Sequence, residues 1–234
     1  MSDQKVSQLT AKTSLAATDQ LYTIDPISKR LTVLDLMKNI GPNNLLTVPV
    51  DSQFSWVNQG TSTVSQTDAG IALVPQLVTG INIRIREKVP NFAPPYTVTV
   101  GMMMLAFNAA TDVVMGAGWR NSGAGTLAVL QVQLHTTYAT CALRSRKYNS
   151  PTAVNSDYVA PGYIYGGGPI WIRFADTGVN RVISMSMDGV NFGSFHSIGR
   201  TDFLTPDRIC FYGNVDSASF QNVFTVFSWK ETTP

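Results

Sequence analysis

Charge is scarce in this chain. Only 14% of its 234 residues are charged, and 17 basic and 15 acidic side chains leave a formal net charge of +2. An average soluble domain has about 25% charged residues, and disordered chains combine high charge with low hydrophobicity. The 44% hydrophobic content therefore excludes a disordered chain. A net charge so close to zero is also too small for the phosphate neutralisation that drives nucleic-acid binding, so we expect no nucleic-acid partner.

Long apolar runs and metal-spaced cysteines are also missing. No apolar stretch reaches the roughly 18 residues that span a bilayer, and the polar start Met1-Ser-Asp-Gln-Lys5 has no apolar signal core. We therefore expect a soluble protein made in a cytoplasm, with no membrane partner. The chain has two cysteines, Cys141 and Cys210, each in a β-like run with no Cys or His at metal spacing. We expect buried free thiols and no disulfide scaffold, metal or cofactor.

The first 43 residues read differently from the rest and begin with a predicted strand. Leu21, Thr23 and Asp25 alternate with Gln20, Tyr22 and Ile24, and Pro26 stops the run. Alternation of this kind, ended by a proline, is typical of a short strand. The sequence therefore predicts a strand at residues 20–25.

A short helix is predicted next, at residues 33–40. Thr32 is a plausible N-cap with Asp35 three residues later, and Gly41-Pro42 supplies the stop. Its apolar stripe consists of Leu34, Met37 and Ile40. A helix of about two turns is not stable alone in water. We therefore interpret residues 1–43 as an attachment or assembly arm, in which Leu21 and this stripe are covered by other protein, such as another subunit.

From about residue 45 the pattern changes to short alternating runs separated by turn residues, with about ten residues between turns. This spacing predicts a mainly β domain at residues 44–234, a two-sheet antiparallel jelly-roll sandwich. Ile81, Ile83 and Ile85 alternate with Asn82, Arg84 and Arg86, which predicts three core side chains and three solvated ones. Tyr96, Val98 and Val100 repeat the pattern, and further strands are expected near residues 129–134, 170–174, 183–187, 208–212 and 224–229. Asp176-Thr-Gly178 and Asp188-Gly189 predict tight turns.

Residues 147–169 do not read as a strand. This Gly- and Pro-rich segment carries Tyr148, Tyr158, Tyr163 and Tyr165. Long loops in compact domains are usually functional or disordered, and four tyrosines argue against disorder. We predict a contact loop, because tyrosine is enriched in recognition surfaces. The alternative is that the tyrosines pin the loop onto their own sandwich.

Trp119 and two groups of basic residues are further candidates for binding. Trp119, among glycines and beside Arg120, is either an exposed stacking platform or a core indole. The basic groups Arg84/Arg86/Lys88 and Arg144/Arg146/Lys147 either lie on solvated strand faces or meet an acidic partner.

Residues for catalysis are few. The chain has two histidines, His135 and His196, and neither lies in a nucleophile motif such as G-x-S-x-G. A glycosidase needs two carboxyl groups about 5–10 Å apart, whereas the only glutamates, Glu87 and Glu231, are far apart in the sequence and outside any E-x-D-x-x-E motif. We predict that the protein is not an enzyme.

Two sets of segments resemble known families. Leu9-Thr-Ala-Lys-Thr13, Asp19-Gln-Leu-Tyr-Thr-Ile-Asp25 and Arg30-Leu-Thr-Val-Leu-Asp-Leu36 resemble the N-terminal segment of many tailed-bacteriophage virion proteins. The downstream segments resemble concanavalin A-like (laminin-G-type) jelly rolls; they are Phe54 to Gly60, Pro169 to Phe174, Ser184 to Phe192 and Phe203 to Asp207. The resemblance implies a non-enzymatic, usually trimeric protein of the virion surface. Such sandwiches also occur as carbohydrate-binding modules.

The leading hypothesis is a homotrimeric capsid decoration (cement) protein, which would contact the major capsid protein or another virion protein on the head. The chain is too short for a long fibre shaft, and its low charge suits a surface buried in contacts. The alternative is a tail fibre or baseplate adhesin that binds a host-surface glycan. A third reading, a depolymerase, would make the protein an enzyme.

Overall fold

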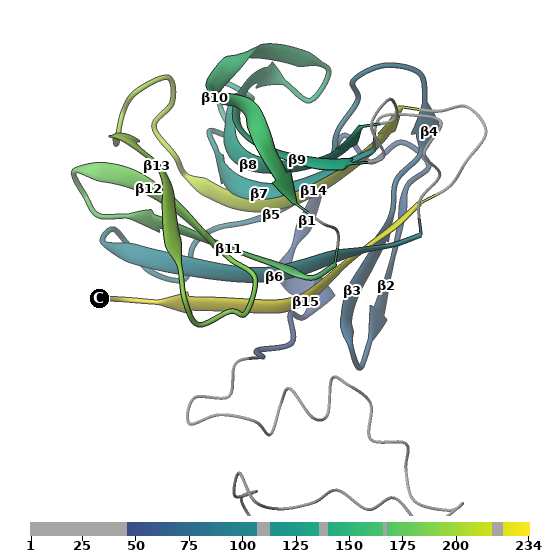
Figure 1. Cartoon of the computed structure of the whole chain (residues 1–234), viewed down its shortest axis with the longest axis horizontal. Helices are drawn as coiled ribbons and strands as arrows, with labels where there is room; N and C mark the ends of the chain where they lie inside the picture. The colour runs from purple at the N-terminus through teal and green to yellow at the C-terminus, as the bar shows by residue number, and fades with distance from the viewer. Residues whose placement is uncertain (1–45, 107–112, 136–139, 166–167, 217–221) are drawn as a thin grey trace, which may run out of the picture. The chain divides into compact units, whose positions relative to one another are not determined.

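The computed structural model describes residues 46–106, 113–135, 140–165, 168–216 and 222–234. These residues form two β-sheets that pack face to face, and the two layers can be followed in Figure 1. The prediction of a mainly β, two-sheet antiparallel jelly roll is confirmed. No helix in this part of the chain is long and apolar enough to cross a membrane. The strand predicted at 20–25, the helix predicted at 33–40 and the arm residues Leu21, Leu34, Met37 and Ile40 lie outside the described residues.

One layer is an eight-stranded sheet. Across it the order is β1 (Ser55–Val57), β5 (Arg84–Lys88), β14 (Arg208–Asp216), β7 (Val113–Arg120), β8 (Leu127–His135), β9 (Thr140–Ser150) and β10 (Ala153–Tyr165). The short strand β4 (Leu77–Val78) pairs with β14 in parallel, and the other pairs are antiparallel.

The other layer is a seven-stranded antiparallel sheet. Its order is β13 (Gly193–Gly199), β12 (Asn180–Ser186), β11 (Ile170–Asp176), β6 (Tyr96–Ala106), β15 (Val223–Thr232), β3 (Gly70–Val74) and β2 (Thr63–Thr67). A 3-10 turn, η2 (Asp51–Gln53), precedes β1.

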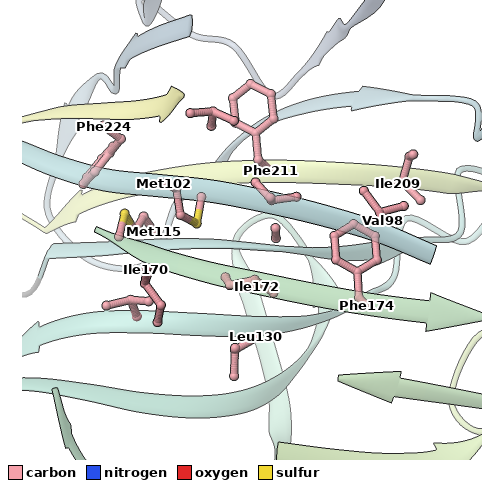
Figure 2. Close-up of a cluster of buried hydrophobic side chains, with 14 of the residues drawn as sticks. Val98, Met102, Met115, Leu130, Ile170, Ile172, Phe174, Ile209, Phe211 and Phe224 are labelled. Carbon is pink, nitrogen blue, oxygen red and sulfur yellow. The ribbon is translucent and has the colours of Figure 1, made fainter. Parts of the chain in front are cut away.

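The main core lies between the sheets. Tyr96, Val98 and Val100 on β6 are buried, as their alternation predicted. The core side chains labelled in Figure 2 come from both sheets: Val98, Met102, Ile170, Ile172, Phe174 and Phe224 from the seven-stranded sheet, and Met115, Leu130, Ile209 and Phe211 from the eight-stranded one. Burial of such side chains stabilises the fold by about 1.5–3 kcal/mol each.

The predicted tight turns are confirmed. Gly178, between β11 and β12, has a φ of +85° and donates its N–H to Asp176 Oδ1 at 2.9 Å. Gly189, after β12, has a φ of +75°. Asp188 Oδ1 accepts the N–H groups of Val190 and Asn191, each at 2.8 Å. Aspartate followed by glycine thus closes this turn through local hydrogen bonds.

Strand β5 differs from its prediction. Arg84 and Arg86 are not solvated but buried, and Ile81 is exposed. The reason is that both faces of β5 are covered. Arg84 donates to the carbonyl oxygen of Asn58 and to Gln76, and Arg86 pairs with Asp51 of η2. Alternation predicts solvation only where one face of a strand meets water.

The second basic group also differs from both interpretations offered for it. Arg146 Nε lies 2.6 Å from Asp157 Oδ1, and Arg144 Nη1 lies 3.5 Å from Asp157 Oδ2. The two arginines therefore share one carboxylate of their own sandwich. Lys147 Nζ lies 4.4 Å from the centroid of the Tyr158 ring, so it too contacts the same domain.

The segment 147–169 is not a loop. It is largely the hairpin of β9 and β10, and the prediction of a long contact loop is wrong. The pairing of β10 with β9 shifts register four times, including between Val159 and Tyr163, around Pro161 and Gly162. β10 is an edge strand, and an edge strand with bulges tolerates proline and glycine that a central strand does not.

Candidate functional site

An open groove lies at the end of β5 in the eight-stranded sheet. Its volume is about 560 Å³, within the range of ligand sites. Strand pairing brings its walls together, since Ser55 of β1 lies opposite Glu87 of β5 and β5 pairs with β14. We call this site the charged groove. Its lining residues are Gln53, Ser55, Glu87, Lys88, Val89, Asn91 and Arg208.

Glu87 forms one wall of the charged groove and is held by two cations. Its Oε2 atom lies 2.7 Å from Arg120 Nη1, and its Oε1 atom lies 3.9 Å from Arg208 Nε. Glu87 and Arg120 are both buried. A charge removed from water needs such a partner, so this pair fixes the side of the groove.

Lys88 joins the groove to the other sheet. Its Nζ atom lies 2.6 Å from Glu231 Oε1 and donates to Asn91 Oδ1 at 2.9 Å. Glu231 Oε2 accepts the N–H of Asn91 at 2.7 Å, and Oε1 accepts Trp229 Nε1–H at 3.0 Å. The segment after β5 is thus tied to β15 through side chain and backbone.

The carboxyl groups in and beside the charged groove are engaged by neighbouring donors. Both carboxylate oxygens of Glu231 accept hydrogen bonds, and the carboxylate of Glu87 forms ion pairs with two arginines. A glycosidase pair needs two carboxyl groups free to face a substrate from opposite sides. The described residues contain no group of three or more His, Cys, Asp or Glu that could hold a metal ion. The groove therefore offers hydrogen-bond donors and acceptors fixed by ion pairs.

Tyr148 was predicted as part of a contact loop, and this prediction is wrong. The side chain is 1% exposed and belongs to a second apolar cluster on the eight-stranded sheet. Its hydroxyl donates to Gln131 Oε1 at 2.5 Å, and the Tyr212 hydroxyl donates to the same atom at 3.2 Å. Burial raises the pKa of both phenols. Tyr148 therefore works as a core residue with a satisfied hydroxyl.

Tyr158 is half-buried and connects the two sheets. From β10 its ring stacks on His196 of β13, with centroids 4.8 Å apart. Its hydroxyl donates to Asp202 Oδ1 at 2.7 Å, and burial raises its pKa. This geometry matches the alternative in which a tyrosine pins its own sandwich. Tyr163 and Tyr165 lie on the same strand. Their side chains are outside the described part of the structure, so the contact prediction for these two residues stays a prediction.

Trp119 is a core indole and not an exposed stacking platform. It is 1% exposed, and its ring meets Phe174 edge to face with centroids 5.2 Å apart. The Arg181 guanidinium lies 5.4 Å from the Trp119 ring centroid. Alternation along β7 explains this position, because Met115, Ala117 and Trp119 all point into the core between the sheets.

Sequence reasoning missed Phe92, the one exposed aromatic side chain in the described ranges for which exposure is given. It is 39% exposed, and it follows Asn91 of the charged groove. The sequence feature that could have pointed to Phe92 is an aromatic residue between Pro90 and Pro94, directly after a strand. Cys210 is a buried free thiol, as predicted, whereas the side chain of Cys141 is outside the described part.

No protein-family model and no curated protein matches this sequence. Solved structures do match. A functionally unknown protein from Saccharomyces cerevisiae has a TM-score of 0.50 at 16% identity, over 78% of this chain and 97% of that one. A mutant of the GH43 protein BlXynB from Bacillus licheniformis has a TM-score of 0.55 at 12% identity.

The match to BlXynB covers 81% of this chain and 38% of that one. The chain therefore spans well under half of BlXynB. A CBM2 module of the Dit protein of Lactobacillus casei BL23 phage J-1 has a TM-score of 0.47 at 8% identity, over 72% of this chain and 76% of that one. At such identities the likeness shows the fold alone. The chain has a jelly-roll β-sandwich fold.

Proposed function

We propose that this chain is a non-enzymatic structural protein of a tailed-bacteriophage virion, and that it acts as a trimeric capsid decoration protein stabilising the head. The observation that carries the proposal is the virion-type N-terminal segment, Leu9-Thr-Ala-Lys-Thr13 to Arg30-Leu-Thr-Val-Leu-Asp-Leu36, followed by a jelly roll. The protein then lies on the virion surface and contacts its own copies and the major capsid protein.

The packing of the sandwich supports the proposal that residues 1–43, and not the sandwich, make the contacts with neighbouring proteins. Trp119 and Tyr148 lie in cores of the sandwich, and Tyr158 binds Asp202 and His196 of the same domain. These large side chains need no partner protein to be covered. Attachment to neighbours then falls to residues 1–43, whose apolar stripe is too small to form a core alone.

The binding chemistry of the charged groove supports a non-enzymatic role. Glu87, which lines the groove, is paired with Arg120 and Arg208, and Glu231, which lies outside the lining, holds Lys88 and the Asn91 backbone. A carboxyl group that must transfer a proton to a substrate needs a free oxygen facing that substrate.

The test uses heads assembled without this protein. We expect such heads to release their DNA at a lower temperature than complete heads, and the purified full chain to sediment with them and restore the release temperature. Light scattering on the purified chain should give the mass of a trimer. Binding to tails but not to heads, or unchanged head stability, would remove the decoration role.

A second candidate function is a tail or baseplate adhesin, and the charged groove favours it. The groove is open, polar and of ligand size, and the exposed apolar side chain of Val89 is part of its lining. Tail location together with binding to host cells would support this candidate.

A further inference from the structure

Two cations lie in one row on the outer surface of the seven-stranded sheet. Arg173 of β11 pairs with Thr99 of β6, and Thr99 pairs with Lys230 of β15. Their chain neighbours Phe174 and Trp229 belong to the core between the sheets, so Arg173 and Lys230 point to the opposite side. Adjacent strands lie about 4.8 Å apart, which puts the Cα atoms of the two cations about 10 Å apart. We call the outer surface of β12, β11, β6 and β15 the cationic face.

The four strands of the cationic face place no carboxylate on it. They carry two carboxylates, Asp176 and Glu231, and each is buried in an ion pair with another cation, at 2.9 and 2.6 Å. In the described part of the chain, neither Arg173 nor Lys230 forms an ion pair, and Lys230 makes no side-chain hydrogen bond either. The face therefore presents positive charge that the sandwich itself does not match.

Arg173 is held in position by an aromatic ring. Its Cζ atom lies 3.6 Å from the ring centroid of Phe192 in the turn after β12, and its Nε donates to Thr99 Oγ1 at 3.4 Å. The carboxylate of Asp188 in the same turn accepts hydrogen bonds from within the turn. A stacked guanidinium loses little rotamer freedom on binding, and the edge of its planar fork can pair with a carboxylate.

We propose that the cationic face binds an acidic surface of another protein, with Arg173 and Lys230 pairing with two carboxylates about 10 Å apart. The inference goes beyond the proposed function, and its partner is a protein other than the neighbours to which residues 1–43 attach. Unmatched cations on one surface and carboxylates on the other give the complementary potentials of a specific interface. Arginine is enriched among the residues that dominate binding energy, which makes Arg173 the anchor of this contact.

The turn after β12 adds apolar area beside the cationic face. The turn borders the face because its Phe192 lies on Arg173. Met187 and Val190 of the turn are 54% and 60% exposed. Protein interfaces combine such apolar contacts with charged and polar groups. A nucleic acid fits this surface less well, because its affinity comes from many cations bound to phosphates and the face offers two.

The test titrates the full chain with a short glutamate homopeptide at low salt, and with single-stranded DNA of the same length. NMR amide shifts locate the contact, and the titration gives the dissociation constant. We expect the peptide to shift the signals of β11, β6 and β15 around Arg173 and Lys230, and to be released as NaCl is added. Arg173→Gln and Lys230→Gln should each weaken the binding about fivefold.

Two further variants separate the cationic face from charge in general. Arg208→Gln is the matched control, because it removes one arginine charge from the eight-stranded sheet, and it should bind the peptide as the unaltered chain does. Phe192→Leu keeps every charge but removes the ring under Arg173, and it should weaken binding about threefold. The amide spectrum of each variant shows whether it is folded.

Three results would overturn the proposal. The first is equal binding of the glutamate peptide by Arg173→Gln, Lys230→Gln and the unaltered chain. The second is the absence of binding, or amide shifts confined to residues outside β11, β6 and β15. The third is tighter binding of the single-stranded DNA than of the peptide, which would replace the acidic protein by a nucleic acid as the partner.

Discussion

Arg120 on β7 and Glu87 on β5 form an ion pair of 2.7 Å that reaches across the intervening strand β14. Both residues are buried, and Arg208 lies 3.9 Å from the other oxygen of the same carboxylate. Three strands of the eight-stranded sheet are therefore linked by side chains at the edge of the charged groove. The pair is a structural feature of the sheet as well as a wall of the groove.

Glu87→Gln should destabilise the protein strongly, because it leaves the buried Arg120 without a counter-charge. Loss of one partner of a buried pair costs about 3 kcal/mol or more. Urea unfolding at neutral pH measures the change in the free energy of unfolding. Asp207→Asn is the control, because the side chain of Asp207 is 44% exposed and a surface pair contributes under about 1 kcal/mol. Equal effects of the two variants would contradict the buried-pair interpretation.

The sandwich could be predicted from the sequence because its strands obey a simple rule. Tyr96, Val98 and Val100 alternate because one face of β6 meets the core. The rule failed at β5, where η2, the carbonyl oxygen of Asn58 and the side chain of Gln76 bind the arginines on the face that alternation assigns to water. It failed again at β10, where Gly162 and Pro161 sit in an irregular edge strand.

The charged groove could not be predicted from the sequence, because it depends on contacts between distant residues. Lys88 and Glu231 are 143 residues apart, and Glu87 and Arg120 are 33 apart. Local patterns carry no information about such pairs. The same limit explains Trp119 and Tyr148, whose aromatic rings suit a core and a binding surface equally well until the strands are paired.

Gly116→Ala should lower stability through overpacking. A Cβ at Gly116 would lie 2.5 Å from the Leu130 carbonyl oxygen and 2.7 Å from the ring of Tyr212. Overpacking of this kind typically costs about 1–3 kcal/mol. Gly162→Ala on β10 is the matched control, because a Cβ there meets nothing within 4 Å. Thermal unfolding compares the two, and a Gly116→Ala variant as stable as Gly162→Ala would contradict the overpacking.

Tyr158→Phe tests the hydrogen bond that links β10 to the segment after β13. The variant keeps the stack on His196 but loses the bond to Asp202, which should cost about 0.5–1.5 kcal/mol. Tyr158→Ala loses both contacts and should cost more. Light scattering should show the same oligomeric mass for both variants as for the unaltered chain. A changed mass with unchanged stability would instead place Tyr158 in a subunit contact.

Acid should weaken the sandwich through His196. Burial and the nearby Arg181 lower the pKa of His196 below its ordinary value of 6.5, while Asp202 acts in the opposite direction. The ring also faces Tyr158, over which Lys147 lies. The unfolded chain therefore binds more protons at this residue as the pH falls below about 6.5, and stability is lost toward the folded-state pKa.

The measurement is urea unfolding at several pH values between about 5 and 7.5. His196→Phe keeps an aromatic ring for the stack and cannot be protonated, so its stability should vary less with pH in this window than that of the unaltered chain. An identical pH dependence in both proteins would exclude His196 as the source.

The central claim, that the chain is a virion structural protein on the head, is tested most directly on purified phage particles. Electron microscopy with a gold-labelled antibody raised against the full chain locates the protein, and particles assembled without it serve as the control. We expect label distributed over the heads and absent from the control. Label confined to the tail would contradict the decoration role in favour of the adhesin, and particles without any label would contradict the virion assignment itself.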